Sequence, residues 1–133
     1  MSYVDFQVKK LQKELSAGTV SLMLLAQLAK ANEPLYGYQI AKQLEQAGEG
    51  ALASKQSALY PVLRNLDAAG LLQSEVEPSV AGPPRRYYQI TPFGREVFTA
   101  WQAVWLQTRN FVDTVLEGAP RRATINPKIF LSI

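Results

Sequence analysis

Three short blocks of sequence set the order of helical and extended segments along this chain. They cover residues 35–40 (LYGYQI), 57–63 (SALYPVL) and 85–91 (RRYYQIT). The first two blocks have the character of helix starts, and the third is typical of a basic strand that leads into a further helix. Most of the chain is therefore expected to be helical, with only a short extended region between the helices. This order predicts a mainly α-helical fold with a small β-hairpin.

The first 30 residues carry one apolar seam at helical spacing. Its members alternate between steps of four and three residues: Val4, Val8, Leu11, Leu15, Gly18, Leu22, Leu25 and Ala29. The pattern predicts either one long helix or an N-terminal amphipathic arm that leads into a core helix beginning near Ser16. We expect the second arrangement, because Gly18 in a helix interior costs about 1 kcal/mol relative to Ala and favours a break there.

Proline and glycine divide the next part of the chain. Pro34 ends the first core helix, a second helix is expected over residues 37–47, and residues 48–50 (GEG) stop it. Ser54 or Ser57 is expected to cap a third helix that ends at residue 69, just before Gly70. Pro61 is compatible with this helix because it falls in the first turn or directly after it.

The remaining elements are a hairpin and a last helix. Residues 71–76 and 86–90 predict two strands joined by a long loop over 78–84. Thr91 as N-cap and Pro92 at the first helical position begin a helix that is expected to end near Glu117. This order of elements predicts a winged helix-turn-helix followed by a long C-terminal helix.

Two apolar stripes run along the last predicted helix. The first stripe consists of Val97, Trp101, Val104, Thr108, Phe111 and Val115, and the second of Phe98, Trp105 and Val112. One stripe can cover a small core, and the spare surface predicts a homodimer interface along the first stripe. The alternative is a long helix that folds back on its own domain.

These segments define four expected regions. Residues 1–15 form an N-terminal amphipathic helix or arm, and residues 16–91 form the winged domain. Residues 92–118 form the C-terminal dimerisation helix, and residues 119–133 form a loosely ordered tail.

The composition removes several classes of function. The chain has 133 residues with no Cys and no His, so thiol nucleophiles, imidazole bases and the commonest zinc ligands are missing. We expect no enzyme activity, no metal and no cofactor. A carboxylate enzyme would need two converging acids, and Glu75 and Glu77 share a strand face without acid–base support.

Charge and hydropathy give weaker indications. The formal net charge of +3 suits a few phosphate contacts per subunit but does not by itself identify a nucleic-acid-binding protein. The longest apolar run, residues 22–26, is far too short to span a bilayer, and the lack of Cys fits a reducing compartment. We therefore expect a soluble, cytoplasmic protein.

Taken together, the sequence blocks resemble the PadR family of bacterial winged-helix transcriptional regulators. The resemblance covers about residues 18–118, and it rests on residues 36–40, 59–63 and 85–88 together with Leu66, Gly70, Leu71, Thr91 and Gly94. The single long C-terminal helix resembles the compact branch of the family, in which this helix and the N-terminal helix build a two-fold dimer. Residues 57–58 (SA) replace the Gly-Thr that members often carry, and the wing tip is rich in proline, which leaves the operator sequence open.

The resemblance implies that residues 57–69 form the recognition helix, with its N-terminal turn toward the DNA groove. The residues that it places at DNA are Tyr38, Lys55, Gln56, Ser57, Tyr60, Arg64, Arg85 and Arg86. Gln56 can address adenine bidentately, and Lys55 suits a guanine acceptor or a phosphate.

Several of these residues have a second interpretation. Tyr60 is either a phosphate donor or a core aromatic. Arg64 is either a backbone clamp or a solvated partner of Asp67. Strand alternation sends Arg85 and Arg86 to opposite faces, so one can meet DNA while the other stays in water or pairs with Glu75 or Glu77.

Trp101 and Trp105 are the candidate effector-binding residues. Some members of the family stack flat aromatic molecules between tryptophans of this helix, and Trp105 best resembles that position, although a tryptophan at a helical interface is commonly a packing residue. The resulting prediction is a homodimeric DNA-binding repressor on a pseudo-palindromic operator, released by a small aromatic effector. The alternative is a winged-helix protein–protein interaction module that does not bind DNA.

Overall fold

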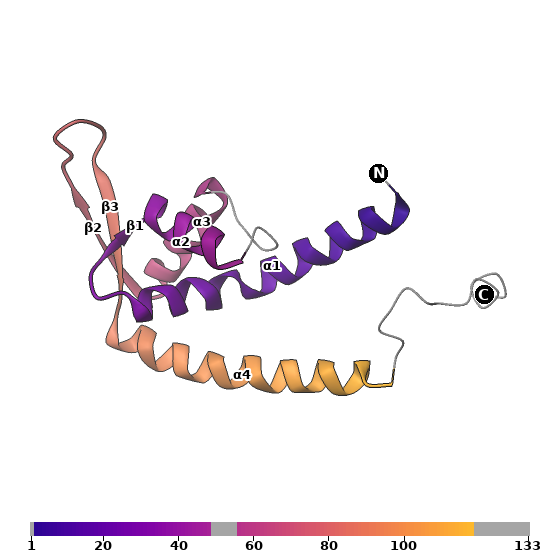
Figure 1. Cartoon of the computed structure of the whole chain (residues 1–133). Helices are drawn as coiled ribbons and strands as arrows, with labels where there is room; N and C mark the ends of the chain where they lie inside the picture. The colour runs from indigo at the N-terminus through magenta and orange to yellow at the C-terminus, as the bar shows by residue number, and fades with distance from the viewer. Residues whose placement is uncertain (1, 49–55, 119–133) are drawn as a thin grey trace. The chain divides into compact units, whose positions relative to one another are not determined.

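The computed structural model describes residues 2–48 and 56–118. The chain divides into two compact units, residues 1–102 and 103–133. In chain order the elements are α1 (Tyr3–Lys30), β1 (Leu35–Tyr36), α2 (Gly37–Gly48), α3 (Gln56–Ala68), β2 (Leu72–Glu77), β3 (Arg85–Ile90) and α4 (Pro92–Leu116). The three strands form one antiparallel sheet in the order β1-β3-β2 (Figure 1). This is the mainly α-helical winged helix-turn-helix that the sequence predicts.

Apolar side chains from α1, α2, α3 and the three strands meet in one core. The fully or nearly fully buried members are Leu24, Leu25, Leu28, Leu35, Ile40, Leu59, Leu63, Leu66, Leu71, Leu72 and Tyr88. Val97, Phe98 and Trp101 of α4 pack against this core from its edge. In the described part of the chain, no helix is both long enough and apolar enough to cross a membrane.

Helix α1 is continuous, so the expected break near residues 16–18 is wrong. A capping box starts the helix: the Asp5 N–H donates to Ser2 Oγ at 3.0 Å, and the Ser2 N–H donates to Asp5 Oδ2 at 3.3 Å. The helix then passes through Gly18 without interruption and ends at Lys30, before Pro34. One interior glycine costs about 1 kcal/mol, which the capped start and the good helix formers on both sides offset.

Residues 35–36 form a short strand that the sequence does not predict, directly before α2, which begins at Gly37 as expected. Leu35 pairs with Tyr88 and Tyr36 with Tyr87, so β1 adds a third strand to the hairpin. The Tyr36 N–H also donates to Gln39 Oε1 at 3.1 Å, at the point where α2 begins. The partner strand lies about 50 residues away in the chain, so no local pattern indicates this pairing.

Helix α3 ends at Gly70 as predicted, through a Schellman motif. The Gly70 N–H donates to the Asp67 carbonyl at 2.9 Å, and the Leu71 N–H donates to the Leu66 carbonyl at 3.0 Å. Gly70 has φ +84°, the left-handed conformation that favours glycine. The motif turns the chain directly into β2.

Thr91 joins the start of α4 to the end of α3. Its Oγ1 accepts the Gly94 N–H at 2.9 Å and donates to the Gly70 carbonyl at 2.7 Å. The Thr91 N–H donates to the Leu71 carbonyl at 3.0 Å. Gly94 is buried, and a Cβ there would stand 2.0 Å from the Leu71 carbonyl oxygen. The predicted Thr-Pro entry is therefore also a tertiary junction.

Candidate nucleic-acid interface

Helix α3 has one buried side and one exposed side. Leu59, Leu63 and Leu66 are buried in the core, whereas Arg64 and Asn65 are exposed on the other side. Gln56 and Ser57 are the first two residues of α3, and Lys55 lies outside the described residues. The helix thus presents a cationic, hydrogen-bonding side to solvent, as a helix that enters the major groove must.

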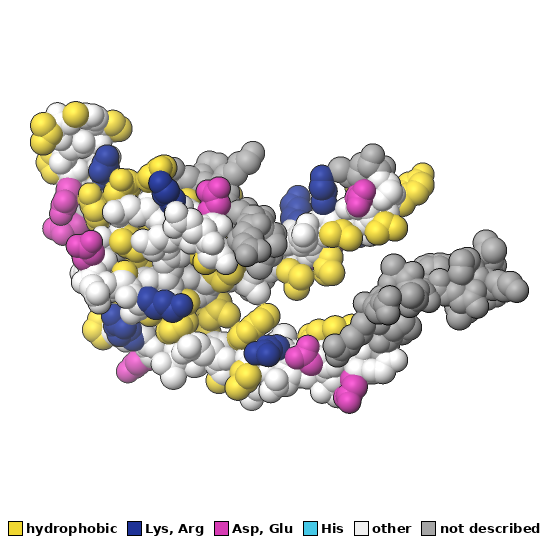
Figure 2. Space-filling model, viewed as in Figure 1, with side chains coloured by type: hydrophobic (Ala, Val, Ile, Leu, Met, Phe, Trp, Pro, Cys, Tyr) yellow, Lys and Arg dark blue, Asp and Glu magenta, His cyan; other side chains and the backbone are white. Residues whose placement is uncertain are grey.

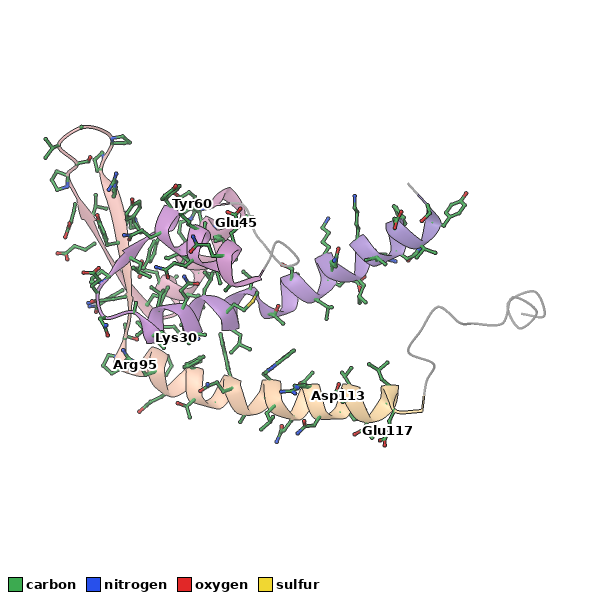
Figure 3. The ribbon with its side chains drawn as sticks, viewed as in Figure 1. Lys30, Glu45, Tyr60, Arg95, Asp113 and Glu117 are labelled. Atoms are coloured by element: carbon green, nitrogen blue, oxygen red, sulfur yellow. The ribbon has the colours of Figure 1, made fainter. Side chains whose placement is uncertain are left out.

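Tyr60 connects α3 to the start of α2. Its ring is partly buried against the core and lies so close to Gly37 that a Cβ at Gly37 would stand 2.5 Å from ring carbon Cε1. Figure 3 shows Tyr60 where α2 and α3 meet. The ring therefore packs against the core, and Gly37 is needed to admit it.

Four aromatic and cationic side chains around Tyr36 form a row that we call the Tyr–Arg row. The Arg85 guanidinium lies 4.5 Å from the centroid of the Tyr36 ring, and the Tyr87 ring meets Tyr36 edge-on at 5.4 Å. Tyr38 stacks on Tyr36 at 6.3 Å, and Lys42 Nζ lies 5.8 Å from the Tyr38 ring. The row joins the outer face of the wing to the first turns of α2.

Sequence reasoning placed Tyr38 and Arg85 at the site, but it missed Lys42 and the contacts of Tyr36 with Arg85 and Tyr87. The spacing of Tyr38 and Lys42 by one helical turn is a local signal that could have found one contact. The contact of Arg85 with Tyr36 depends on the β1–β3 pairing and had no such signal. A guanidinium held over a ring keeps its N–H donors available to a phosphate.

Arg86 lies on the opposite face of β3 from Arg85, as strand alternation predicts. It donates from Nη1 to Ser74 Oγ at 3.0 Å, and the Ser74 hydroxyl donates in turn to Asp67 Oδ2. Its hydrogen-bond partner is thus Ser74 and not Glu75 or Glu77, the acidic partners that the sequence offered as one alternative. The chain of hydrogen bonds links the exposed wing arginine to α3.

Tyr88 is buried beneath this link. Burial raises the pKa of the Tyr88 hydroxyl, and nearby Asp67 raises it further, while Arg86 opposes the shift. Tyr88 therefore stays neutral throughout the physiological range and acts as a core residue under the arginine.

Comparison with known proteins identifies the chain. The model of the transcriptional regulator PadR-like family matches residues 24–100, more than half of the sequence. The chain belongs to the PadR-like family of transcriptional regulators. A PadR family transcriptional regulator from Eggerthella lenta is 34% identical, with a TM-score of 0.75 over 86% of this chain and 96% of the other.

Two further proteins are similar to this chain over most of their own length. A PadR-like transcriptional regulator from Bacillus cereus is 25% identical, with a TM-score of 0.64 over 79% of this chain and 98% of its own. An uncharacterised protein of Lysinibacillus sphaericus is 24% identical over 62% of this chain and 76% of its own length. The PadR-like family consists of transcriptional regulators, which confirms the family resemblance and the prediction that this chain is a DNA-binding regulator and not an enzyme.

In this PadR-like regulator, the predicted interface stripe of α4 changes character along the helix. Val97 and Trp101 are partly buried and pack against the core of the first unit. Val104, Thr108, Phe111 and Val115 are exposed, as is Trp105 at 43%. The first part of the stripe thus covers the core, and the second part remains on the surface.

A hollow of about 650 Å³ lies between α1 and α2, lined by residues that include Met23, Gln27, Leu35 and Leu44. Neither Trp101 nor Trp105 lines it. Among the residues that the structure describes, no three His, Cys, Asp or Glu side chains group as metal ligands would.

Proposed function

We propose that this PadR-like regulator is a homodimer that binds a pseudo-palindromic operator and acts as a repressor. The observation that carries the proposal is the exposed side of α3, which presents Arg64 while Leu59 and Leu63 anchor the helix in the core. A helix held in this way can enter a major groove without losing its packing. A dimer that occupies its operator excludes other proteins from the same DNA.

The proposed DNA-contacting residues fall into three groups. Gln56 and Ser57 at the start of α3, with Lys55 before them in the sequence, read base edges, and Arg64 and the Tyr60 hydroxyl contact the backbone. Tyr38 and Arg85 bind phosphates beside the groove, with Arg85 oriented by the Tyr36 ring at 4.5 Å, and Arg86 reaches a phosphate from the opposite face of β3. The link of Arg86 to Ser74 and Asp67 supports a fixed position of the wing relative to α3.

The homodimer is proposed to use the exposed part of α4. Large apolar side chains on this helix remain at least 43% exposed: Val104, Trp105, Leu106, Phe111, Val112, Val115 and Leu116. A group of this size on the surface indicates a protein–protein interface. We assign residues 92–118 to dimerisation on this ground and residues 16–91 to DNA binding.

Selection of duplexes from a random pool, followed by fluorescence anisotropy at several salt concentrations, tests this function. The wild-type chain should enrich a two-fold motif and show a steep salt dependence. Arg64→Gln should weaken binding about tenfold and reduce the slope of log K against log [salt] by about 0.9 for each phosphate that the variant no longer neutralises.

Arg109→Gln is the matched control for Arg64→Gln. Arg109 lies on α4, where it pairs with Asp113 at 3.8 Å, and its replacement should leave the salt slope unchanged. Weak, salt-insensitive binding with no enriched motif would contradict DNA binding and favour the protein–protein interaction module. In that case the weak binding to duplex DNA and its salt dependence would be the same in a triple variant with Lys55→Ala, Arg64→Ala and Arg86→Ala.

We further propose that a small planar aromatic effector releases the operator by binding at Trp105, with Trp101 beside it. A ligand that prefers one spacing of the two recognition helices shifts the dimer toward that spacing. Naphthalene- and quinoline-type compounds should quench tryptophan fluorescence and weaken operator binding, and Trp105→Phe should remove both effects. Quenching without any change in operator affinity would contradict the effector role.

A further inference from the structure

The N-terminal half of α1 extends well beyond the domain that it belongs to. The buried residues of α1 are Leu24, Leu25 and Leu28, all in its C-terminal half. Residues 3–15 are exposed throughout, and at 1.5 Å per residue this segment is about 20 Å long. A capping box at Ser2 and Asp5 holds its first turn, so the segment is an ordered helix.

This segment has two chemically different faces. At about 100° per residue, Val4, Val8, Leu11 and Leu15 lie within an arc of about 60°. Lys9, Lys10 and Lys13 lie within an arc of about 100° on the other side, and we call them the lysine face. Figure 2 shows dark blue side chains above this part of α1 and yellow ones below it. Among the described residues, none of the three lysines forms an ion pair.

The lysine face points toward the side on which α2 and α3 lie. Lys10 precedes Leu28 by five turns of 3.6 residues, so the two side chains leave the helix in the same direction. Lys13 and Leu24 differ by only about 20° in the same way. Leu24 and Leu28 are buried in the core that they share with α2 and α3. The three lysines therefore lie on the same side of α1 as α2 and α3, but further toward the N-terminus of the helix.

The dimensions of DNA bring phosphates within reach of this face. Packed helices lie about 8–10 Å apart, so the axis of α3 is about one helix diameter above α1. The major groove is about 8.5 Å deep. The phosphates on either side of the groove therefore lie about that far from its floor, toward the body of a protein whose helix is inserted in it. When α3 lies in the groove, these backbone phosphates are thus close to the lysine side chains on α1.

We propose that the lysine face of α1, formed by Lys9, Lys10 and Lys13, binds the DNA backbone beside the half-site that α3 reads. The proposal rests on the DNA-binding function proposed above. The segment of about 20 Å spans a little over half of a helical turn of DNA, which is about 34 Å. These contacts add affinity and salt dependence but no base preference, because they meet phosphates alone.

The test uses the full chain with Lys9→Gln, Lys10→Gln and Lys13→Gln, measured against the duplex that the wild type selects. Operator affinity should fall at least tenfold, the salt slope should decrease by about 0.9 for each phosphate left without its lysine, and the selected motif should stay the same. Replacing the same three lysines with Arg should keep the affinity within about twofold. Lys30→Gln, on the same helix but about 200° around from Lys10, should have no effect.

The outcomes separate this proposal from the one that it rests on. Wild-type binding with an unchanged Gln variant overturns the lysine contact and leaves the DNA-binding function standing. An Arg variant as weak as the Gln variant also overturns it, because the weakening would then not come from charge. A wild-type chain that binds no duplex overturns both, and an acidic protein or lipid would then be the partner of the lysine face.

Discussion

Replacing Gly94 with Ala should lower the free energy of unfolding by about 3 kcal/mol, a large part of the total stability of a domain this size. The new Cβ would stand 2.0 Å from the Leu71 carbonyl oxygen and 2.8 Å from Ile90 Cγ1. The carbonyl cannot retreat freely, because it accepts the Thr91 N–H at 3.0 Å. Urea unfolding followed by circular dichroism measures the change.

Gly82→Ala provides the control for the substitution at Gly94. A Cβ at Gly82 would meet nothing closer than Ser79 Oγ at 3.7 Å, and its φ is not positive, so the stability should change by less than about 0.5 kcal/mol. Equal stabilities for the two variants would show that α4 can shift away from Leu71. The Thr91 junction would then be less rigid than its hydrogen bonds suggest.

Replacing both Phe111 and Val115 with Glu should convert the proposed dimer to a monomer and weaken operator binding about 100-fold. The two side chains are 69% and 65% exposed, so the helix itself should survive. Two charges in an apolar interface oppose association, and each half-site must then be bound without the advantage of a linked second site. Analytical ultracentrifugation gives the mass, and anisotropy gives the affinity.

Asn110→Glu is the control for the α4 variant because it adds a charge to the same helix away from the Phe111 stripe. It should keep both the dimer and the affinity. A double variant that stays dimeric would contradict the assignment of α4 to dimerisation. A monomer that still binds the operator at full strength would contradict the two-fold mode of recognition.

Much of the fold could be predicted because its signals are local. Gly70 ends α3 through its own positive φ, and Thr91 followed by Pro92 begins α4 through contacts within one turn. The apolar residues of α3, Leu59, Leu63 and Leu66, recur at helical spacing and are all buried. Such features depend on the backbone preferences of a few neighbouring residues, which the sequence states directly.

The tertiary structure decided the features that join distant segments. The pairing of β1 with β3 added a third strand to the hairpin and placed Tyr36 under Arg85. The same sheet placed Arg86 beside Ser74, whose hydroxyl reaches Asp67 on α3.

By itself, the sequence determined the order of the helices and the hairpin, most of their ends and the apolar faces of the helices, since each follows from spacing within a few residues. Only the folded chain decided that α1 continues past Gly18 and which side chains of the wing and the helices meet. The continuity of α1 depends on the sum of many small free-energy contributions, and the side-chain contacts depend on partners tens of residues away. A local sequence pattern indicates neither of them.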